Sequence, residues 1–405
     1  MPKMRVPLAP ISSSLALCAS FLVALSTATA QEMPLSEAVA IERALAREGI
    51  AARDDAERAA SVAEIDTIGP LENPSLEVSR ESVGGESEWQ LGVVQPIDLG
   101  GRRGALRDAA RAEAQAVEAD IDRRRQVLVG EVRAAYVECA AASASLEIRE
   151  LYVADLAEAG RVSSARADAG DTAVYDVRRV RVEQRSAEAE LAQARGEAAG
   201  DCAALASLTG IEAPQVELDA IARLASGQAS AGRPDLLAQE QRLLAASQRV
   251  SAARKARLPQ IAIGAGVKRV DDGFSTAYGP VVSLGVSLPI WNGGEAEVRR
   301  SEALRSALES ELLIARRRVE AEQVASAARA SASREAAVTA ARARDDAGRL
   351  GTIAETAYQS GEIGVVELLD AYEAARDADL SVVALALDAA LAAVEYDLAT
   401  GRTYR

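Results

Sequence analysis

The sequence predicts a mainly α-helical protein with a small β part, organised as two similar structural repeats. Three observations support this fold class. Alanine supplies most of an apolar fraction of 49%, aromatic residues make up only 3% of the chain, and proline and glycine landmarks recur in both halves. Alanine is the best helix former and lets two helices approach closely, so this composition favours long paired helices.

The N-terminus has the pattern of a secretory signal peptide, which we expect to cover residues 1–30. Lys3 and Arg5 give a basic start, a short apolar stretch follows, and Ala28-Thr29-Ala30 has the small residues of a cleavage site. The apolar stretch is shorter than the roughly 20 residues that a membrane-spanning helix needs. We therefore expect a secreted chain, and a membrane crossing elsewhere would have to use strands.

Charge and composition argue against several classes of function. The chain has 46 basic and 61 acidic residues, a net charge of −15, which disfavours nucleic acid and anionic lipid head groups as partners. It contains no histidine, which removes His-based catalytic triads and His metal ligands. No nucleophile motif, phosphate loop or Cys/His cluster occurs in the sequence. We therefore expect no enzyme, no cofactor and no metal site.

The repeat is visible as an ordered series of matching landmarks with coherent spacing. Such regularity indicates two similar structural units. We predict a first repeat at 31–210, a linker at 211–232 and a second repeat at 233–405. The landmark pairs are Asn73-Pro74 with Leu258-Pro259, Gln95-Pro96-Ile97 with Leu288-Pro289-Ile290, Gly100-Gly101 with Gly293-Gly294, Gly170 with Gly361, and Thr209-Gly210 with Thr400-Gly401.

Each repeat begins with a helix and a β-hairpin. The predicted helices, at 35–66 and 234–256, end before a proline, because the residue before proline is pushed out of the helical region. Apolar and polar residues then alternate at 75–97 and 260–290, around turns rich in glycine and aspartate. Alternation with period two predicts strands, and these turns predict hairpins.

Long helices follow the Gly-Gly pairs. The stretches 102–169 and 295–360 contain no proline, and each would extend over roughly 100 Å as a helix. Gly170 and Gly361 then turn the chain into a shorter helix that returns alongside the long one. Each repeat therefore contains one long α-helical hairpin.

The four strands have an apolar face and a face of small or polar residues, as in a lipid-facing barrel with a wet interior. Four strands cannot close a barrel, since the smallest membrane barrels have about eight. We therefore expect several chains to unite and pair their strand edges. The alternative is a small soluble sheet packed on the helices, which would need more aromatic or branched residues on one helical face.

Two cysteines remain after the predicted cleavage, Cys139 and Cys202. They lie at almost equal distances before and after Gly170, so an antiparallel hairpin would bring them to the same level. Secreted chains meet an oxidising compartment. We predict a Cys139–Cys202 disulfide, and the alternative is two small thiols buried in an alanine-rich seam.

Taken together, these landmarks resemble the TolC-type outer-membrane factors, the exit ducts of tripartite efflux pumps. The resemblance covers nearly all of residues 35–401, and the Gly-Gly-Arg-Arg start of the first long helix is most similar to the heavy-metal efflux branch. It implies a homotrimer with a twelve-stranded barrel in outer-membrane lipid and a periplasmic tunnel of helices. It also implies two partners, a periplasmic adaptor and an inner-membrane pump of the RND type. The implied cargo is metal cations or drugs.

The resemblance also implies a gate at the periplasmic end of the tunnel. By position in the segment that follows Gly361, the gate residues would be Glu367 and Asp370. A spacing of three places both carboxylates on one side of a helix. Three chains would form a ring of six carboxylates, which would attract a cation or a proton when closed. The alternative is an ordinary solvated acidic face.

Two further sets of residues are implied near this tip. Asp176 and Arg179 occupy the equivalent places in the first repeat, and Arg178 lies beside them. The three would form a latch of ion pairs between neighbouring hairpins, unless they are simply solvated. The residues of the two turns, Gly170, Asp171, Gly361 and Glu362, would be the docking tips for the adaptor. Any antiparallel helical pair also needs such a turn, so a purely structural role is the alternative.

A different class of function is a soluble periplasmic adaptor or scaffold with coiled-coil helices. It would explain the helices and the acidity. It does not explain strands before the long helix of each repeat. A periplasmic enzyme explains the sequence least well, because no catalytic constellation occurs.

Overall fold

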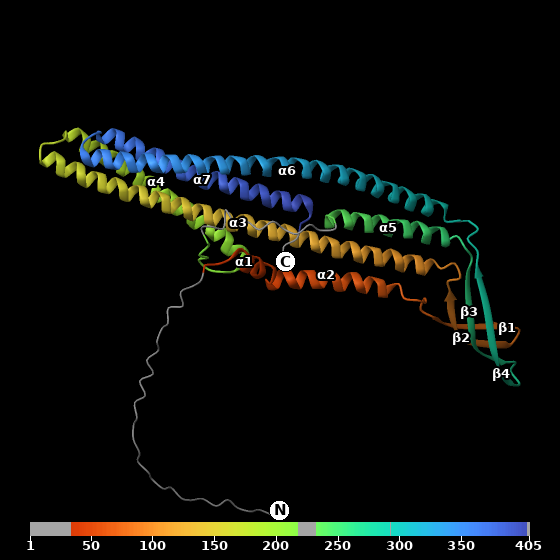
Figure 1. The fold of residues 1–405 in the computed structure, drawn as a ribbon. Coiled ribbons are helices and arrows are strands. Elements are labelled where there is room, and N and C mark those ends of the chain that lie inside the picture. Colours follow the sequence, from red (N-terminus) through yellow and green to blue (C-terminus); the bar gives the residue numbers. More distant parts are fainter. Residues whose placement is uncertain (1–33, 218–231, 292, 403–405) are drawn as a thin grey trace, which may run out of the picture. The chain divides into compact units, whose positions relative to one another are not determined.

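The fold consists of helices and one sheet, seen in a computed structural model that describes residues 34–217, 232–291 and 293–402 (Figure 1). These residues belong to one compact unit, Pro34–Arg405. The signal peptide predicted at 1–30 and most of the predicted linker at 211–232 lie outside the described residues. The described elements are α1 (Glu37–Leu45), α2 (Glu48–Thr67), β1 (Ser75–Val83), β2 (Glu86–Ile97), α3 (Arg102–Asp168), α4 (Val174–Thr209), α5 (Pro234–Lys255), β3 (Gln260–Asp271), β4 (Thr276–Ser287), α6 (Glu295–Ser360) and α7 (Val365–Thr400).

The prediction of a single helix at 35–66 is wrong, because the chain forms two helices there, α1 and α2, with a break between them. Ser36 caps α1, its hydroxyl accepting the backbone N–H of Val39 at 3.4 Å. The break falls at Arg47, which is extended with ψ of 129°. Its guanidinium donates to the carbonyl of Ser207 at the end of α4, at 2.5 Å. This long-range contact accompanies the break, and Gly49, a poor helix former, is the local sign near it.

The two long helices, α3 and α6, have the bounds expected from the Gly-Gly and glycine landmarks. Gly101 precedes α3 with φ of 67°, a left-handed conformation that glycine adopts without steric cost. Asp98 accepts the backbone N–H of Arg103 at 2.7 Å, which satisfies one of the donors at the start of α3. Among the described residues, no helix combines the length and apolar character needed to cross a membrane.

Each long helix turns at a glycine and is followed by a return helix. Gly170, with φ of 84°, joins α3 to α4, and Gly361, with φ of 79°, joins α6 to α7. The pairs α3–α4 and α6–α7 lie side by side along their length (Figure 1). The predicted helical hairpins are confirmed, one in each half of the chain.

The strands form one antiparallel sheet in the order β1-β2-β3-β4. Each half contributes a hairpin, β1–β2 or β3–β4, and the pairing of β2 with β3 joins them. In the second turn, the Asp272 carboxylate accepts the backbone N–H groups of Phe274 and Ser275. The four predicted strands are therefore confirmed, and β1 and β4 are the two edges of the sheet.

Alanine lines the seams between helices, as the composition indicated. Ala109 and Ala112 of α3 pack against Ala245 of α5, and one turn later Ala116 packs against Ala238. All five are buried. Because alanine has a small side chain, α3 and α5 approach closely without needing large apolar residues.

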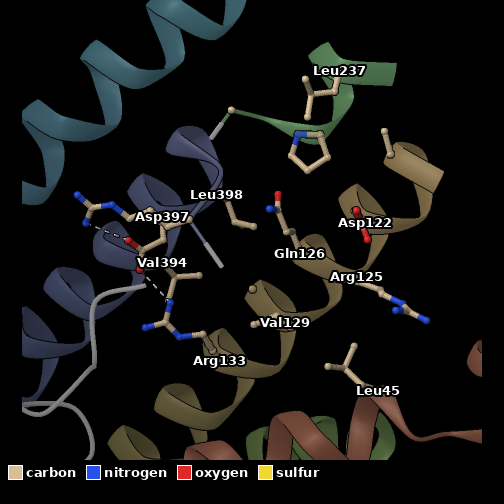
Figure 2. A pocket seen from close by; sticks show the side chains of 15 residues that line it. Leu45, Asp122, Arg125, Gln126, Val129, Arg133, Leu237, Val394, Asp397 and Leu398 are labelled. Carbon is tan, nitrogen blue, oxygen red and sulfur yellow. Dashed lines mark hydrogen bonds and ion pairs between the residues drawn. The ribbon is translucent and has the colours of Figure 1, made fainter. Parts of the chain in front are cut away.

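A cavity of about 340 Å³ lies where α3 meets the start of α5 and the end of α7 (Figure 2). Arg133 of α3 is almost fully buried beside it and forms ion pairs with Asp397 (3.1 Å) and Glu37 (2.5 Å). Gln126 donates to the carbonyl of Gly401 at 3.2 Å. These contacts connect α1, α3 and the end of α7, so we assign them a structural role.

Candidate functional site

One face of the sheet is apolar and exposed. In an antiparallel sheet, residues directly opposite one another lie on the same face. The register therefore places rows of apolar residues across all four strands, including Val282, which is 81% exposed. Two adjacent rows are Val78, Leu91, Val267 and Pro280, and Leu76, Val93, Ala265 and Val282.

The opposite face carries small and polar residues. Glu77 and Gly92 form part of one row there, and Gln90 and Lys268 lie opposite each other in another. A sheet with one exposed apolar face and one polar face suits a boundary between lipid and water. Its edges, β1 and β4, also leave the outward hydrogen-bonding groups of two strands without a partner strand among the described residues.

The predicted gate residues lie on the exposed side of the first turns of α7. Glu367 and Asp370 are exposed, whereas Leu368 and Leu369 between them are buried in the core that the two helical hairpins share. The two carboxylates therefore lie on one side of the helix, as their spacing predicts. Whether they surround a pore depends on other chains, so the gate stays a prediction.

A connection between the two hairpins lies beside this site and was not predicted from the sequence. The hydroxyl of Tyr358, at the end of α6, hydrogen-bonds that of Ser163 on α3 at 2.8 Å, and both side chains are buried. Arg166, one turn further along α3, donates to the Tyr358 carbonyl at 3.0 Å and lies over its ring at 5.1 Å. The sequence places Arg166 and Tyr358 at the same level, each one turn before a glycine turn, but it does not indicate that their helix faces meet.

A second connection joins α7 to the first hairpin. The guanidinium of Arg376 lies over the ring of Tyr152 on α3, 4.5 Å from its centre. One of its nitrogens is 3.8 Å from a carboxylate oxygen of Glu190 on α4. Arg376 is only 11% exposed, so this contact is shielded from water more than a surface ion pair is. Together the two connections join the hairpins of one chain near the tip.

The seam where α3, α6 and α7 meet is negatively charged. Burial raises the pKa of the Asp155 carboxyl on α3, and the charge of Glu355 on α6 raises it further. Burial also raises the pKa of Tyr372 on α7 to about 12, and the charges of Glu355 and Asp155 add to the effect. The tip therefore carries acidic groups on the seam as well as on the exposed side of α7.

The predicted latch residues make contacts within their own hairpin. Asp176 accepts a hydrogen bond from the Thr172 hydroxyl at 2.5 Å, and Arg179 lies 3.9 Å from Glu183, four residues along α4. Arg178 is exposed. The structure does not bring these residues to Glu367 or Asp370 of the same chain. A latch between neighbouring chains stays a prediction.

The predicted docking tips are exposed at the ends of the hairpins. The backbone N–H of Asp171 donates to the Arg166 carbonyl, and that of Glu362 to the Ala357 carbonyl, both at 2.8 Å. These bonds close the two helix ends in the same way. A side chain added at Gly170 would meet open space within this chain.

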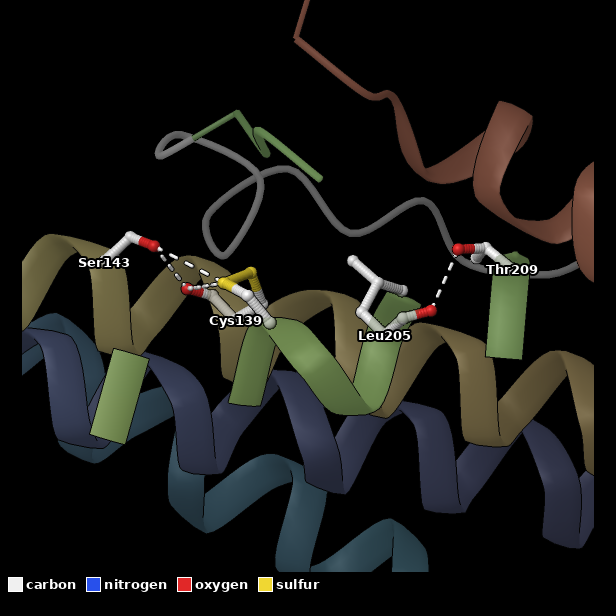
Figure 3. Close-up of a disulfide and its surroundings, with 5 residues drawn as sticks. Cys139, Ser143, Leu205 and Thr209 are labelled. Carbon is white, nitrogen blue, oxygen red and sulfur yellow. Dashed lines mark hydrogen bonds between the residues drawn. A yellow bond between two sulfur atoms is a disulfide. The ribbon is translucent and has the colours of Figure 1, made fainter. Parts of the chain in front are cut away.

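Cys139 of α3 and Cys202 of α4 are joined by a disulfide, with their Cα atoms 4.6 Å apart (Figure 3). Cys139 is fully buried, and the Ser143 hydroxyl donates to its carbonyl at 2.8 Å. The bond ties the first hairpin together near its base. No cluster of three or more potential metal-ligating residues occurs within 34–217, 232–291 and 293–402.

The match to a known family decides the identity of this architecture. Residues 24–211 and 225–402 match the family described as outer membrane efflux protein. The chain belongs to this family. Its two matched segments correspond to the two halves of the chain, each with one hairpin of strands and one of helices.

Curated relatives of the chain serve in efflux and resistance. The nickel-cobalt-cadmium resistance protein NccC of Alcaligenes xylosoxydans xylosoxydans is 27% identical over 59% of this chain and 58% of its own length. The solvent efflux pump outer membrane protein SrpC of Pseudomonas putida is 30% identical over 52% of this chain and 48% of its own length. The chain thus spans about half the length of the curated relatives it matches.

Solved structures share the fold across nearly the whole chain. The outer-membrane protein VceC of Vibrio cholerae superposes with a TM-score of 0.73, at 20% identity, covering 91% of this chain and 97% of that one. CusC superposes equally well, with a TM-score of 0.73, at 20% identity, covering 91% and 92%. The family membership and this fold make the chain an outer-membrane protein with long helical hairpins.

Proposed function

We propose that this outer membrane efflux protein is the exit duct of a tripartite efflux pump, conducting substrate passively from periplasm to exterior. Three chains would unite, each contributing four strands to a twelve-stranded barrel and two helical hairpins to a periplasmic tunnel. The observation that carries the proposal is the sheet, with its exposed apolar face and with β1 and β4 as edge strands among the described residues. A soluble adaptor would not expose such an apolar face to water.

The partners and cargo form part of the same proposal. A periplasmic adaptor would dock at the tips, and an inner-membrane pump of the RND type would select the substrate. Metal cations or drugs are the proposed cargo. The name of NccC, a nickel-cobalt-cadmium resistance protein, supports metal cations. The name of SrpC, from a solvent efflux pump, supports small organic compounds, the broader class to which drugs belong.

The function is tested with the full-length protein extracted from outer membranes in detergent. We expect chemical cross-linking to give trimers and purified trimers to conduct ions across planar lipid bilayers. The reason is that the strand edges of single chains need partners, and only closure encloses a pore. A stably folded monomer that stays soluble without detergent would contradict the proposal.

A bulky residue at a docking tip is expected to block pump assembly. Gly170→Trp places a large side chain into open space within this chain, so its main clash would be with a docked adaptor. We expect cross-linking to the adaptor to be lost while trimers stay intact on native gels. Any side chain at Gly170 strains the turn, because φ is 84°.

Gly170→Ala is therefore the matched control, since it introduces the same backbone strain without the bulk. It should retain most of the adaptor cross-linking. Equal loss in both variants would point to the turn conformation, and normal cross-linking of Gly170→Trp would count against docking at this tip.

A further inference from the structure

Basic side chains gather where the helices adjoin the sheet, although the chain as a whole is acidic. α3 begins after β2, α5 ends before β3, and α6 begins after β4, so these three helix ends lie at one end of the sheet (Figure 1). We call residues 98–111, 254–258 and 295–302, together with Glu72, the basic collar. It contains nine basic and six acidic residues, against a net charge of −15 for the chain.

Every acidic group of the basic collar is already engaged within the chain. Asp98 accepts the backbone N–H of Arg103. The other five each have an arginine partner within 3.4 Å. These pairs are Glu72 with Arg103, Asp108 with Arg111, Glu295 with Arg257, Glu297 with Arg300, and Glu302 with Arg254.

The remaining cations form a surplus of positive charge. Arg102, Arg107 and Arg299 have no acidic partner among the described residues, and the buried Nε of Arg107 has no hydrogen-bond acceptor there. Within the part of the chain that the structure describes, Lys255 donates only to a neutral group, the carbonyl of Gly101, at 3.2 Å. Ion pairing among the described residues therefore leaves this surplus for an external anion.

Exposed apolar side chains accompany this surplus. Leu99, Leu258, Ile290 and Trp291 lie in the short connections between strands and helices, and Trp291 is 95% exposed. Tryptophan and arginine beside an apolar surface are typical of the interface between hydrocarbon and lipid head groups. The apolar rows of the sheet run into these connections, since Ile97 precedes Leu99 in the chain and Ile261 follows Leu258.

We infer that the basic collar binds the head groups of anionic phospholipids in the periplasmic leaflet. The phosphates would contact the surplus cations, and the exposed leucines and Trp291 would lie at the level where the acyl chains begin. This inference rests on the proposed function, because it requires the strands to cross the membrane. It also reverses, for this region, the expectation from net charge that anionic lipid heads are not partners.

The test uses purified full-length protein in a neutral detergent, titrated with phosphatidylglycerol or with phosphatidylcholine of the same acyl chains. Bound lipids are counted by native mass spectrometry. We expect the wild type to prefer phosphatidylglycerol, and the preference to weaken as salt rises. The variant Arg102→Gln, Arg107→Gln, Arg299→Gln should lower the affinity for phosphatidylglycerol by about fivefold or more and leave that for phosphatidylcholine unchanged.

A matched control removes three exposed arginines of α6 far from the sheet, Arg317→Gln, Arg318→Gln and Arg334→Gln. It makes the same change in net charge and should bind phosphatidylglycerol like the wild type. Equal affinities of the two triple variants, or no lipid preference in the wild type, would overturn the inference. The conductance of the same preparations in planar bilayers distinguishes this outcome from failure of the proposed channel. A protein that conducts ions without a lipid preference would overturn this inference alone.

Discussion

Replacing Glu367 and Asp370 together by alanine is expected to raise the conductance of trimers in planar bilayers severalfold. In the proposed trimer these residues form a ring of six carboxylates that narrows the pore and binds cations. Removing the ring widens the constriction and abolishes a binding site that slows passing ions, so cation selectivity should fall as well. Single-channel recordings at fixed salt measure both quantities.

The structure indicates that this change leaves the fold intact. Both side chains are exposed on α7, while the adjacent Leu368 and Leu369 provide the packing against the other helices. Surface substitutions of this kind usually change stability little. An increase in conductance would therefore report on the pore and not on local unfolding.

Two comparisons sharpen the result. Glu367→Gln with Asp370→Asn removes the charges but keeps the size, so it separates electrostatic from steric closure. Glu188→Ala with Glu197→Ala removes two exposed carboxylates from α4 and should leave conductance unchanged. If the alanine variant conducts like the wild type, Glu367 and Asp370 do not form the gate.

Removing the disulfide is expected to lower the free energy of unfolding more than any other substitution considered. The bond closes a loop of 63 residues around the tip of the first hairpin, which limits the entropy of the unfolded chain. For a loop of this length, chain-entropy arguments give about 4 kcal/mol. The variant Cys139→Ser with Cys202→Ser should therefore unfold at clearly lower denaturant or temperature than the wild type.

Thermal unfolding of detergent-solubilised trimers, with and without reducing agent, measures this effect. The wild type should approach the double variant when reduced, whereas the double variant should not respond to the reductant. Ser143→Ala, which removes the hydroxyl that bonds the Cys139 carbonyl, controls for local packing. Alkylation of both cysteines without prior reduction, seen by mass, would refute the bond in the cell.

Local patterns in the sequence predicted most of the architecture. Period-two alternation identified the four strands, and Gly101, Gly170, Gly294 and Gly361 marked the ends of the long helices, because a left-handed residue is needed at each. Spacing around Gly170 placed the two cysteines at the same level. These signals act within one element or one hairpin, so they can be found without knowing how the hairpins pack.

Local patterns of this kind could not predict contacts between segments that are distant in the sequence. Arg47, at the break, bonds a carbonyl of α4, and the connection between Tyr358 and Ser163 joins residues from different repeats. Both are decided by which helix faces meet. The net charge of the chain predicted no binding of anionic lipid head groups for a related reason. A sum over all residues hides the local surplus of positive charge that ion pairing leaves at Arg102, Arg107 and Arg299.

The pairing of β2 with β3 places one strand of each repeat at the sheet's margins. In the proposed trimer, β1 of one subunit would meet β4 of the next, an unlike contact repeated around a ring. Every subunit then forms two such β1–β4 contacts, and a single defective edge strand leaves the barrel open. A co-expressed chain with a disrupted β1 should therefore be dominant-negative, because it would inactivate trimers in which the other two subunits are wild type.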